Sequence, residues 1–335
     1  MGRGRNVRVV FLGTPDFAVP SLLELQRARH EIVLTICQPD RPAGRGLKMR
    51  PSAVKKIAME RGLPLYQPQS LGEEAIARVS GLDFDVVVVV AYGLILPRAF
   101  LALPPRGCVN LHASLLPRYR GAAPVAHAIL RGEKVIGVTT LLMDEGIDTG
   151  PVLLQRESFI GEQETAGEVE ARLGILGAEL LVETLRRWEP GELIPKSQVL
   201  DRETYAPKIS AAEGRIRWAD QATSIDRQIR ALNPRPGAFA YHQGRLVKVW
   251  RGLVDASSGA TEAPGTILQD PKSVCVACGG GTILRILELQ MEGRRRVSGE
   301  EAVRGRWFLP GDSLDQQRDD SRESPGRRLR SAPES

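Results

Sequence analysis

Short strand-like runs of apolar residues alternate with helical patterns through the first half of the chain. The strand-like runs cover residues 7–13, 31–38, 85–92, 108–112 and 135–143. One helical pattern follows the first run and ends near residue 27, and two others cover residues 123–130 and 165–188. Residues 86–91 are apolar on both faces, as in a central parallel strand whose sheet is covered on both sides by helices. The alternation predicts an α/β fold with a doubly wound, mostly parallel sheet, which binds ligands beyond the carboxyl ends of its strands.

The pattern changes in the second half of the chain. Residues 190–208 contain many turn-forming residues and predict a linker after a first domain over residues 1–189. Short strand-like runs then recur at residues 247–250, 266–268, 273–277 and 283–289, with one helix at residues 224–232. They predict a smaller β-rich domain, of β-barrel type, over residues 209–312. Residues 313–335 have only two large apolar side chains, Leu314 and Leu329, and are predicted to be a disordered tail.

Length and composition fit a soluble protein of two domains. The 335 residues are 42% hydrophobic and 26% charged, which excludes a fibrous or wholly disordered chain. No apolar stretch approaches the roughly 20 residues of a membrane-spanning helix, and no signal-peptide pattern opens the chain. Four cysteines do not make a disulfide framework. The sequence therefore predicts a cytoplasmic protein.

The positive charge of the chain is unevenly distributed. Residues 1–207 carry 25 basic and 24 acidic side chains, whereas residues 208–312 carry 16 basic and 11 acidic ones. The tail has five of each, so nearly all of the net charge of +6 belongs to the second domain. This excess indicates either an anionic partner for that domain or an ordinary basic surface.

Two polar residues lie within the strand predicted at residues 108–112. Because side chains alternate along a strand, Asn110 and His112 point to the same face, about 7 Å apart. A Ser-Leu-Leu-Pro turn follows and places both near the carboxyl end of the strand. An amide can donate to a developing oxyanion, and an imidazole can polarise a carbonyl or move a proton, so the pair suits acyl transfer. The alternative is a histidine that is merely hydrogen-bonded at a strand end.

Asp148 lies in a glycine-punctuated loop directly after the strand predicted at residues 135–143. If that strand neighbours the one at residues 108–112, the loop reaches the Asn110–His112 end of the sheet. A carboxylate there could favour the charged form of His112 and accept a proton from an attacking amine. The alternative is an aspartate that serves only a β-turn.

Residues 41–56 contain six basic side chains and no acidic one. The basic residues are Arg41, Arg45, Lys48, Arg50, Lys55 and Lys56. Pro42, Gly44 and Gly46 disfavour helix or strand through the middle of this segment. A flexible basic loop can order against phosphates or enter an RNA groove. The alternative is a solvated loop without a partner.

From about residue 7 to 310 the chain resembles the methionyl-tRNA formyltransferase family and, more broadly, the folate-dependent formyltransferases. The segments that carry the resemblance are FLGTPDFAVPSL (11–22), QPDRPAGRG (38–46), VVVAYGLILP (88–97), NLHASLLPRYRGAAPV (110–125), MDEGIDTG (143–150) and the weaker NPRPGAF (233–239). The resemblance implies that Asn110, His112 and Asp148 are catalytic. It also implies that a turn contacts the folate; that turn is Ser114, Leu115, Leu116 and Pro117.

The resemblance further implies a reaction and its partners. A formyl group would move from 10-formyltetrahydrofolate, as co-substrate and without a metal, to the α-amino group of methionyl initiator tRNA. The basic loop would contact the tRNA through Arg41, Arg45, Lys48 and Arg50, with Arg45 the most important. The second domain would be an oligonucleotide-binding-like barrel that also contacts the tRNA, and the protein would be a monomer.

Two other functions remain open at this stage. The catalytic and folate motifs are shared by relatives that formylate small amines, such as glycinamide ribonucleotide or an amino-sugar nucleotide. A non-catalytic RNA-binding protein on the same fold is the second alternative. Cys275 and Cys278 form a single Cys-x-x-Cys motif without further metal ligands, so a zinc site is not expected. Trp218, Trp250 and Trp307 suit core packing better than base stacking.

Overall fold

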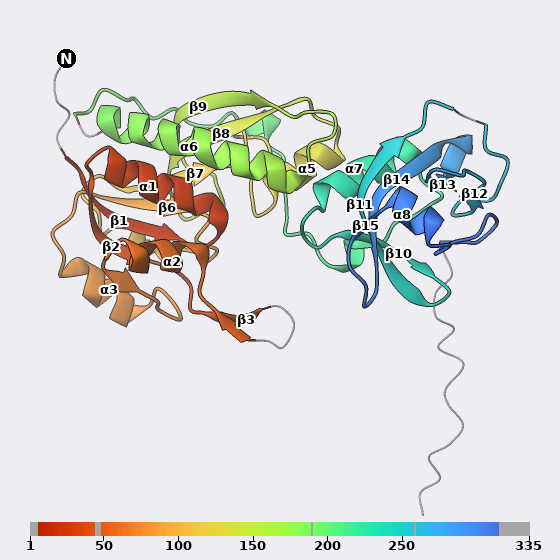
Figure 1. Ribbon diagram of the computed structural model, residues 1–335. Helices are drawn as coiled ribbons and strands as arrows, with labels where there is room; N and C mark the ends of the chain where they lie inside the picture. Colours follow the sequence, from red (N-terminus) through yellow and green to blue (C-terminus); the bar gives the residue numbers. More distant parts are fainter. Residues whose placement is uncertain (1–5, 44–47, 189, 258, 315–335) are drawn as a thin grey trace, which may run out of the picture. The chain divides into compact units, whose positions relative to one another are not determined.

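The computed structural model describes residues 6–43, 48–188, 190–257 and 259–314 (Figure 1). The chain divides into two compact units. The first comprises Met1–Ser210 and Arg230–Pro234, and the second comprises Ala211–Ile229 and Arg235–Ser335. The domain limits inferred from the sequence, 1–189, 190–208, 209–312 and 313–335, stay predictions.

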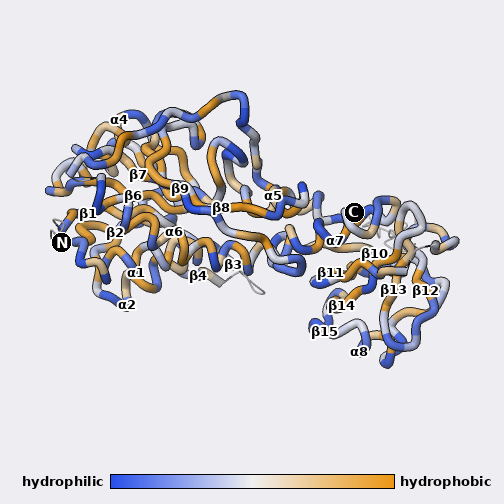
Figure 2. The backbone as a smooth tube through the Cα atoms, turned by 90° about the horizontal axis from the view of Figure 1, so that it is seen from above, coloured by the Kyte–Doolittle hydropathy of each residue, from blue (hydrophilic) through white to orange (hydrophobic). Residues whose placement is uncertain are grey.

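A twisted sheet forms the centre of the first unit. Among the described residues it has seven strands in the order β5-β2-β1-β6-β7-β8-β9. The strands are β1 (Arg8–Gly13), β2 (Glu31–Ile36), β5 (Leu65–Tyr66), β6 (Val86–Val90), β7 (Cys108–His112), β8 (Val135–Leu142) and β9 (Val152–Phe159). Pairing is parallel from β5 to β7, and β8 and β9 continue the sheet in antiparallel fashion. Figure 2 shows hydrophobic residues concentrated along the central strands.

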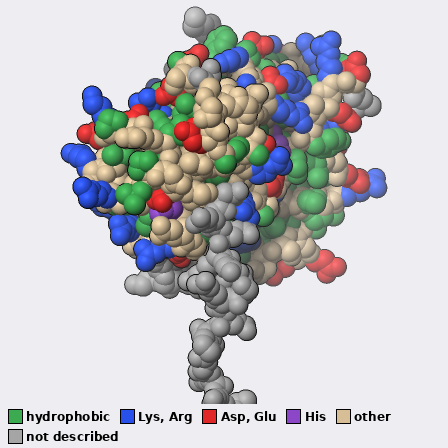
Figure 3. Space-filling view, turned by 90° about the vertical axis from the view of Figure 1, so that its right-hand side faces the viewer, with side chains coloured by type: hydrophobic (Ala, Val, Ile, Leu, Met, Phe, Trp, Pro, Cys, Tyr) green, Lys and Arg blue, Asp and Glu red, His purple; other side chains and the backbone are tan. Residues whose placement is uncertain are grey.

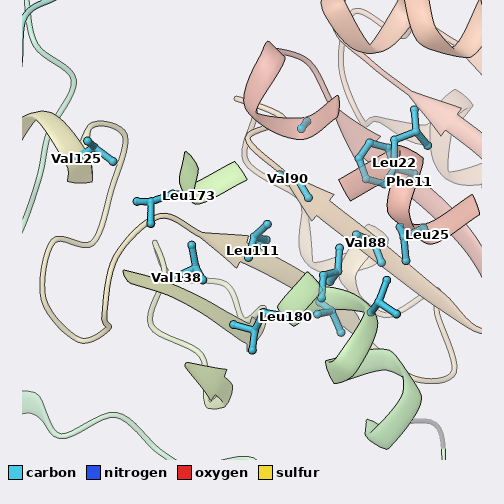
Figure 4. Packing of buried hydrophobic residues seen from close by; sticks show 14 of the residues in the cluster. Phe11, Leu22, Leu25, Val88, Val90, Leu111, Val125, Val138, Leu173 and Leu180 are labelled. Atoms are coloured by element: carbon cyan, nitrogen blue, oxygen red, sulfur yellow. The ribbon is translucent and has the colours of Figure 1, made fainter. Parts of the chain in front are cut away.

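Helices cover both faces of this sheet. They are α1 (Val19–Arg27), α2 (Ala53–Glu60), α3 (Glu73–Ser80), α4 (Arg98–Leu101), α5 (Pro124–Leu130) and α6 (Ala166–Trp188), with 3-10 turns η1 (Asp16–Ala18) and η2 (Leu200–Arg202). Phe11 of β1 packs in one buried cluster with residues of α1 and α6, which lie together on one face (Figures 1 and 4). The neighbouring Leu12 belongs to a second cluster, with residues of α3 and α4. Successive strand residues thus face opposite layers, which confirms the predicted doubly wound α/β fold.

The second unit is built on an antiparallel sheet that curls into a half-barrel around its own core. Its strands are β10 (Ala238–His242), β11 (Arg245–Val254), β12 (Ile267–Leu268), β13 (Val274–Ala277), β14 (Ile283–Met291) and β15 (Val297–Ser298). The strand order is β10-β11-β14-β13-β12, and β15 pairs with β14. Gln243 and Gly244 both have positive φ values, 48° and 74°, as the tight turn between β10 and β11 requires.

Two helices and two 3-10 turns complete the second unit within the described ranges. They are α7 (Ala222–Ala231), which belongs to this unit up to Ile229, α8 (Gly299–Arg304), η3 (Ala212–Gly214) and η4 (Gly279–Gly281). Ser298 begins α8 with a capping box, because its side chain accepts from Glu301 N and the Glu301 carboxylate accepts from Ser298 N.

The end of the second unit differs from the sequence-based expectation. Leu314, placed in the predicted disordered tail, is 1% exposed and packs in the core of this unit. Its backbone N–H donates to Gly265 O at 2.9 Å, and Thr266 forms a β-bridge with Ser313. The prediction failed for Leu314 because it rested on the low apolar content of residues 313–335 as a whole, whereas Leu314 itself packs in the core and its backbone is hydrogen-bonded. The rest of the predicted tail, residues 315–335, lies outside the described residues.

Candidate active site

The predicted pair Asn110 and His112 lies on β7, between the parallel β6 and the antiparallel β8. The two residues alternate with apolar neighbours and are 8% and 6% exposed. Both side chains are therefore almost fully removed from solvent, and a buried polar group needs a partner.

Asp148 supplies that partner for both residues. Asn110 Nδ2 donates to Asp148 Oδ1 at 3.2 Å, and His112 Nδ1 lies 3.5 Å from Asp148 Oδ2. The backbone N–H of Gly121 also donates to Asp148 Oδ2, at 2.9 Å. The structure thus brings the three predicted catalytic residues together. Asn110 and His112 come from β7, and Asp148 and Gly121 come from two loops.

The loop carrying Asp148 reaches this place by a route that sequence reasoning missed. We expected it at the carboxyl end of β7, but β8 runs antiparallel to β7, and Met143 N donates to Cys108 O at the opposite end of that strand. Because Asp148 still contacts both Asn110 and His112, the loop lies over the face of the sheet that carries those side chains.

Both ring nitrogens of His112 face oxygen atoms. Nε2 lies 2.9 Å from Tyr119 O, which can only accept, and Nδ1 faces the Asp148 carboxylate. The His112 ring is thus held between a backbone carbonyl and the Asp148 carboxylate.

The predicted folate-contacting turn, residues 114–117, packs tightly beside this cluster. Ser114 Oγ donates to Arg118 O at 2.6 Å, which closes the turn. Thr139 on β8 accepts from Leu116 N at 3.2 Å and donates to Ser114 O at 2.6 Å. Gln155 on β9 donates to Leu116 O at 2.9 Å. These bonds fix the turn against the sheet, although its folate contacts stay a prediction.

The segment predicted as a linker contributes residues to the site, which the sequence did not suggest. Arg120 N donates to Thr204 O at 2.8 Å, and Ala206 N donates to Arg120 O at 2.7 Å. Gln198 Nε2 donates to the backbone carbonyls of Asp148 and Gly150, each at 2.8 Å. The sequence could not predict this role, because the segment contains mainly turn-forming residues and its contacts are with residues far away in the sequence.

The two ends of the basic loop that the structure describes pair as a hairpin. β3 (Arg41–Ala43) pairs antiparallel with β4 (Lys48–Arg50), so the expectation that proline would keep this segment out of a strand was wrong for Pro42. Proline is tolerated there because β3 lies at an edge. Arg41 and Arg50 are exposed. Arg45 and the side chain of Lys48 lie outside the described residues.

A polar network holds the base of this hairpin. Asp40 accepts from Lys55 Nζ at 2.7 Å and from Gln67 Nε2 at 2.9 Å. These hydrogen bonds, from Gln67 first and Lys55 second, lower the pKa of Asp40. Arg41 donates to Gln38 Oε1 at 2.7 Å, and Gln38 donates to Tyr92 O at 2.8 Å. The hairpin is thereby tied to the loop after β6.

The second unit carries basic and aromatic side chains in contact. Trp218 and Trp250 are buried, as expected for core packing, and Arg296 lies over the Trp250 ring at 4.1 Å. Trp307 is half-buried beside a hollow of about 610 Å³, whose basic lining residues are Arg294, Arg295 and Arg304. Lys and Arg side chains are spread over the face seen in Figure 3.

Within the residues that the structure describes, no group of three or more His, Cys, Asp or Glu side chains could hold a metal ion. Cys275 and Cys278 are free and buried, and burial raises their pKa values to about 11 and about 12. Within the same residues, no helix has the length and apolar character to cross a membrane.

Comparison with protein families gives two matches in this chain. The model described as "Formyl transferase" matches residues 7–185, and "Formyl transferase, C-terminal domain" matches residues 208–306. Among curated proteins, the Methionyl-tRNA formyltransferase of Caldanaerobacter subterraneus subsp. tengcongensis is 44% identical over 301 residues, or 89% of this chain and 97% of the relative. The protein of that name from Ruegeria pomeroyi is 47% identical over 305 residues, 91% of this chain and 98% of the relative.

Solved structures share the fold at low identity. The N-formyltransferase from Helicobacter canadensis, in complex with folinic acid and dTDP-3-aminofucose, has a TM-score of 0.63 and 18% identity, and the match covers 84% of this chain and 98% of that one. HypX from Aquifex aeolicus, in complex with tetrahydrofolic acid, has a TM-score of 0.63 and 17% identity over 89% of this chain. This chain spans about half the length of HypX, since 47% of HypX is covered.

Proposed function

The chain belongs to the formyl transferase family, and from that premise we propose that it transfers a formyl group from 10-formyltetrahydrofolate to the α-amino group of methionyl initiator tRNA. The single observation that carries the chemistry is the contact of one carboxylate, Asp148, with both Asn110 and His112. The acceptor rests on the curated relatives, which match nearly the whole chain and are named for methionyl-tRNA.

The reaction needs no covalent intermediate on the protein. The amine of the methionyl group attacks the formyl carbon, and a carbon–nitrogen bond forms while the carbonyl oxygen becomes an oxyanion. Asn110 donates a hydrogen bond to that oxyanion, and the positive charge of His112 stabilises it further. The bond to the folate nitrogen then breaks, and the carbonyl re-forms.

Protons balance across these steps. The attacking amine loses one proton, and the departing folate nitrogen gains one. Asp148 accepts the first, because its carboxylate is the base beside Asn110 and His112. His112 assists the departure of the folate nitrogen by donating the proton that this nitrogen gains. The proton held by Asp148 then restores His112, whose Nδ1 lies 3.5 Å from Asp148 Oδ2.

The formyl donor, 10-formyltetrahydrofolate, and the tRNA would bind to separate parts of the first unit. The turn at Ser114, Leu115, Leu116 and Pro117 would contact the folate. Arg41, Arg45, Lys48 and Arg50 of the basic loop would contact the tRNA. The exposure of Arg41 and Arg50 supports this role, since phosphate contacts need accessible cations. The basic second unit would bind the same tRNA, and the protein would act as a monomer in the cytoplasm.

The decisive experiment measures formyl transfer to methionyl initiator tRNA at low and moderate salt. Arg45→Ala is compared with wild type and with Arg61→Ala, an exposed arginine outside the hairpin. We expect Arg45→Ala to reduce kcat/KM at least tenfold and Arg61→Ala to have little effect, since a lost phosphate contact weakens binding. A wild-type enzyme that ignores the tRNA but formylates an amino-sugar nucleotide would replace this acceptor with a small amine.

A further inference from the structure

After α6 the chain returns to the candidate active site, where it forms hydrogen bonds with the loop after β7 and with the start of β9. Lys196 and Val152 exchange two backbone hydrogen bonds of 2.8 Å at the start of β9. Tyr119 N donates to Thr204 Oγ1 at 2.8 Å, next to the Arg120 and Thr204 backbone pair. Residues 196–207, which we call the return segment, are therefore anchored to the loop after β7 and to the strand after the Asp148 loop.

A buried arginine crosses between these elements. The Arg120 side chain is 1% exposed, and its Nη1 donates to Glu203 Oε2 at 2.5 Å. Its Nε and Nη2 both donate to Gln198 Oε1, at 3.1 and 2.8 Å. A guanidinium only donates, so it holds the oxygen of the Gln198 amide toward itself and turns the amide nitrogen the other way.

The amide nitrogen of Gln198 reaches the backbone that carries Asp148. It donates to Asp148 O and to Gly150 O, each at 2.8 Å. Asp148 has a φ of 53°, in the left-handed region that residues other than glycine rarely adopt. Two hydrogen bonds on either side of this turn hold it in that conformation, which directs the carboxylate toward Asn110 and His112.

We infer that Gln198, oriented by Arg120, is the positioning residue for the general base Asp148. It holds the Asp148 carboxylate within reach of Asn110 and His112, so its loss lowers turnover while leaving the folate and tRNA contacts in place. This inference rests on the proposed function for its kinetic readout, and a spectroscopic readout makes it testable without that function.

The test replaces Gln198 by methionine, which keeps the length of the side chain and removes every hydrogen bond. The matched control is Gln228→Met. Gln228 Nε2 also donates to two backbone carbonyls, those of Glu213 at 2.8 Å and Arg215 at 3.0 Å, but it lies in the second unit. We expect Gln198→Met to lower kcat about 10- to 100-fold with both KM values within about twofold of wild type, since small displacements of a catalytic group have effects of that size. The control keeps its kcat.

A double-mutant cycle shows whether Gln198 acts through Asp148. In an Asp148→Asn background, Gln198→Met should lower kcat no further, because residues that act as a unit are not additive. A loss of the same factor in both backgrounds would overturn the inference, as would a Gln198→Met enzyme with the kcat of the control.

Two additions keep the test decisive. Gln198→Glu retains an acceptor for Arg120, so the buried guanidinium stays paired, and it replaces the donor to Asp148 and Gly150 by a carboxylate oxygen that both carbonyls repel. It should lose at least as much kcat as expected for Gln198→Met, and it serves as the test if Gln198→Met does not fold. NMR signals of the His112 ring, whose Nδ1 lies 3.5 Å from Asp148 Oδ2, should move in Gln198→Met and stay in Gln228→Met, since neither substitution adds a charge. Unmoved signals would contradict the positioning role, whereas a wild type that does not formylate the tRNA would contradict only the proposed function.

Discussion

His112 Nδ1 lies 3.5 Å from Asp148 Oδ2, although one residue is on a central strand and the other is on a loop that leaves the sheet at the far end of that strand. The contact is between two largely buried groups, with side chains 7% and 15% exposed. In such surroundings electrostatic interactions are screened weakly by solvent, so a change of charge on either group strongly affects the other. Together with the hydrogen bond from Asn110 to Asp148, this contact supports the proposed catalytic role of the three residues.

Removing either donor from β7 should abolish most of the turnover. We expect Asn110→Ala and His112→Ala to lower kcat by about 100- to 1,000-fold, the usual effect of losing one oxyanion donor. The control is His127→Ala, since His127 Nε2 also bonds to a backbone carbonyl, Pro207 O at 3.0 Å, away from Asp148. Single-turnover formylation and circular dichroism measure rate and folding; wild-type turnover in a folded His112→Ala would refute its role.

His30 should make the first unit sensitive to mild acid. Its Nδ1 accepts from Val7 N at 3.2 Å, and burial, followed by the nearby charge of Arg186, lowers the pKa of His30. The unfolded chain therefore binds the proton more readily than the folded one. Stability is full above the ordinary histidine pKa of about 6.5 and falls as the pH drops below it toward the lowered value.

The replacement His30→Asn tests this expectation. The Asn oxygen can accept from Val7 N as Nδ1 does, but it does not titrate. Urea unfolding at pH 7.5 and pH 5 should show a smaller loss of unfolding free energy in the variant than in wild type, and Arg186→Gln should lie between them. Equal losses in all three proteins would show that His30 is not the acid-sensitive group.

The sequence predicted those strands and helices whose local pattern of apolar residues is regular. The alternation of Asn110 and His112 within an apolar strand predicted β7 with its bounds, and helical spacing predicted α6 to within one residue of its start. β9 was missed because residues 152–159 form an outer strand with mixed exposure, so neither face is uniformly apolar. A local pattern is informative only when the strand or helix has one clearly buried side.

The missing parts of the candidate site depend on contacts between distant segments. Arg120 resembles an exposed loop cation in the sequence, yet Glu203 and Gln198 allow its complete burial. Gln198 lies among turn-forming residues, and only the three-dimensional structure brings its amide to Asp148. No spacing rule connects these positions, because the return segment and the catalytic loops are joined by tertiary packing alone.

Weakening the base of the basic hairpin should affect tRNA binding more than turnover. Asp40 directly precedes β3 and is fixed by Lys55 and Gln67. We expect Asp40→Asn to raise KM for tRNA up to about fivefold with kcat nearly unchanged, in line with the roughly 0.2–1 kcal/mol of a partly exposed ion pair. Asp83→Asn, an exposed aspartate paired with Arg8, is the control.

The sign of the pH effect at Asp40 provides a second check. Hydrogen bonds from Gln67 and then Lys55 lower the pKa of Asp40, so its contribution to stability is complete above the ordinary aspartate pKa of about 4. It is lost only as the pH falls through the lowered value. The difference in KM between wild type and Asp40→Asn should therefore be constant from pH 6 to pH 8; a difference that vanishes in this range would point to another group.

Leu314 should be a structural residue of the second unit. It is 1% exposed, it packs with the core of the half-barrel, and its carbonyl oxygen accepts from Trp218 Nε1 at 3.3 Å. Leu314→Ala should lower the free energy of unfolding by about 2–5 kcal/mol, because a buried leucine loses its transfer energy and leaves a cavity. The control, Leu309→Ala, removes a side chain that is 57% exposed and should change stability by less than about 0.5 kcal/mol.

Tryptophan fluorescence during urea unfolding can separate these two variants. Trp218 is 2% exposed and bonded to the Leu314 backbone, so its emission reports on the part of the second unit that the mutation touches. A lower midpoint for Leu314→Ala with an unchanged midpoint for Leu309→Ala would show that the folded unit extends past Asp312. Equal midpoints in both variants would instead support the domain end at residue 312, because a leucine in a disordered tail contributes nothing to the core.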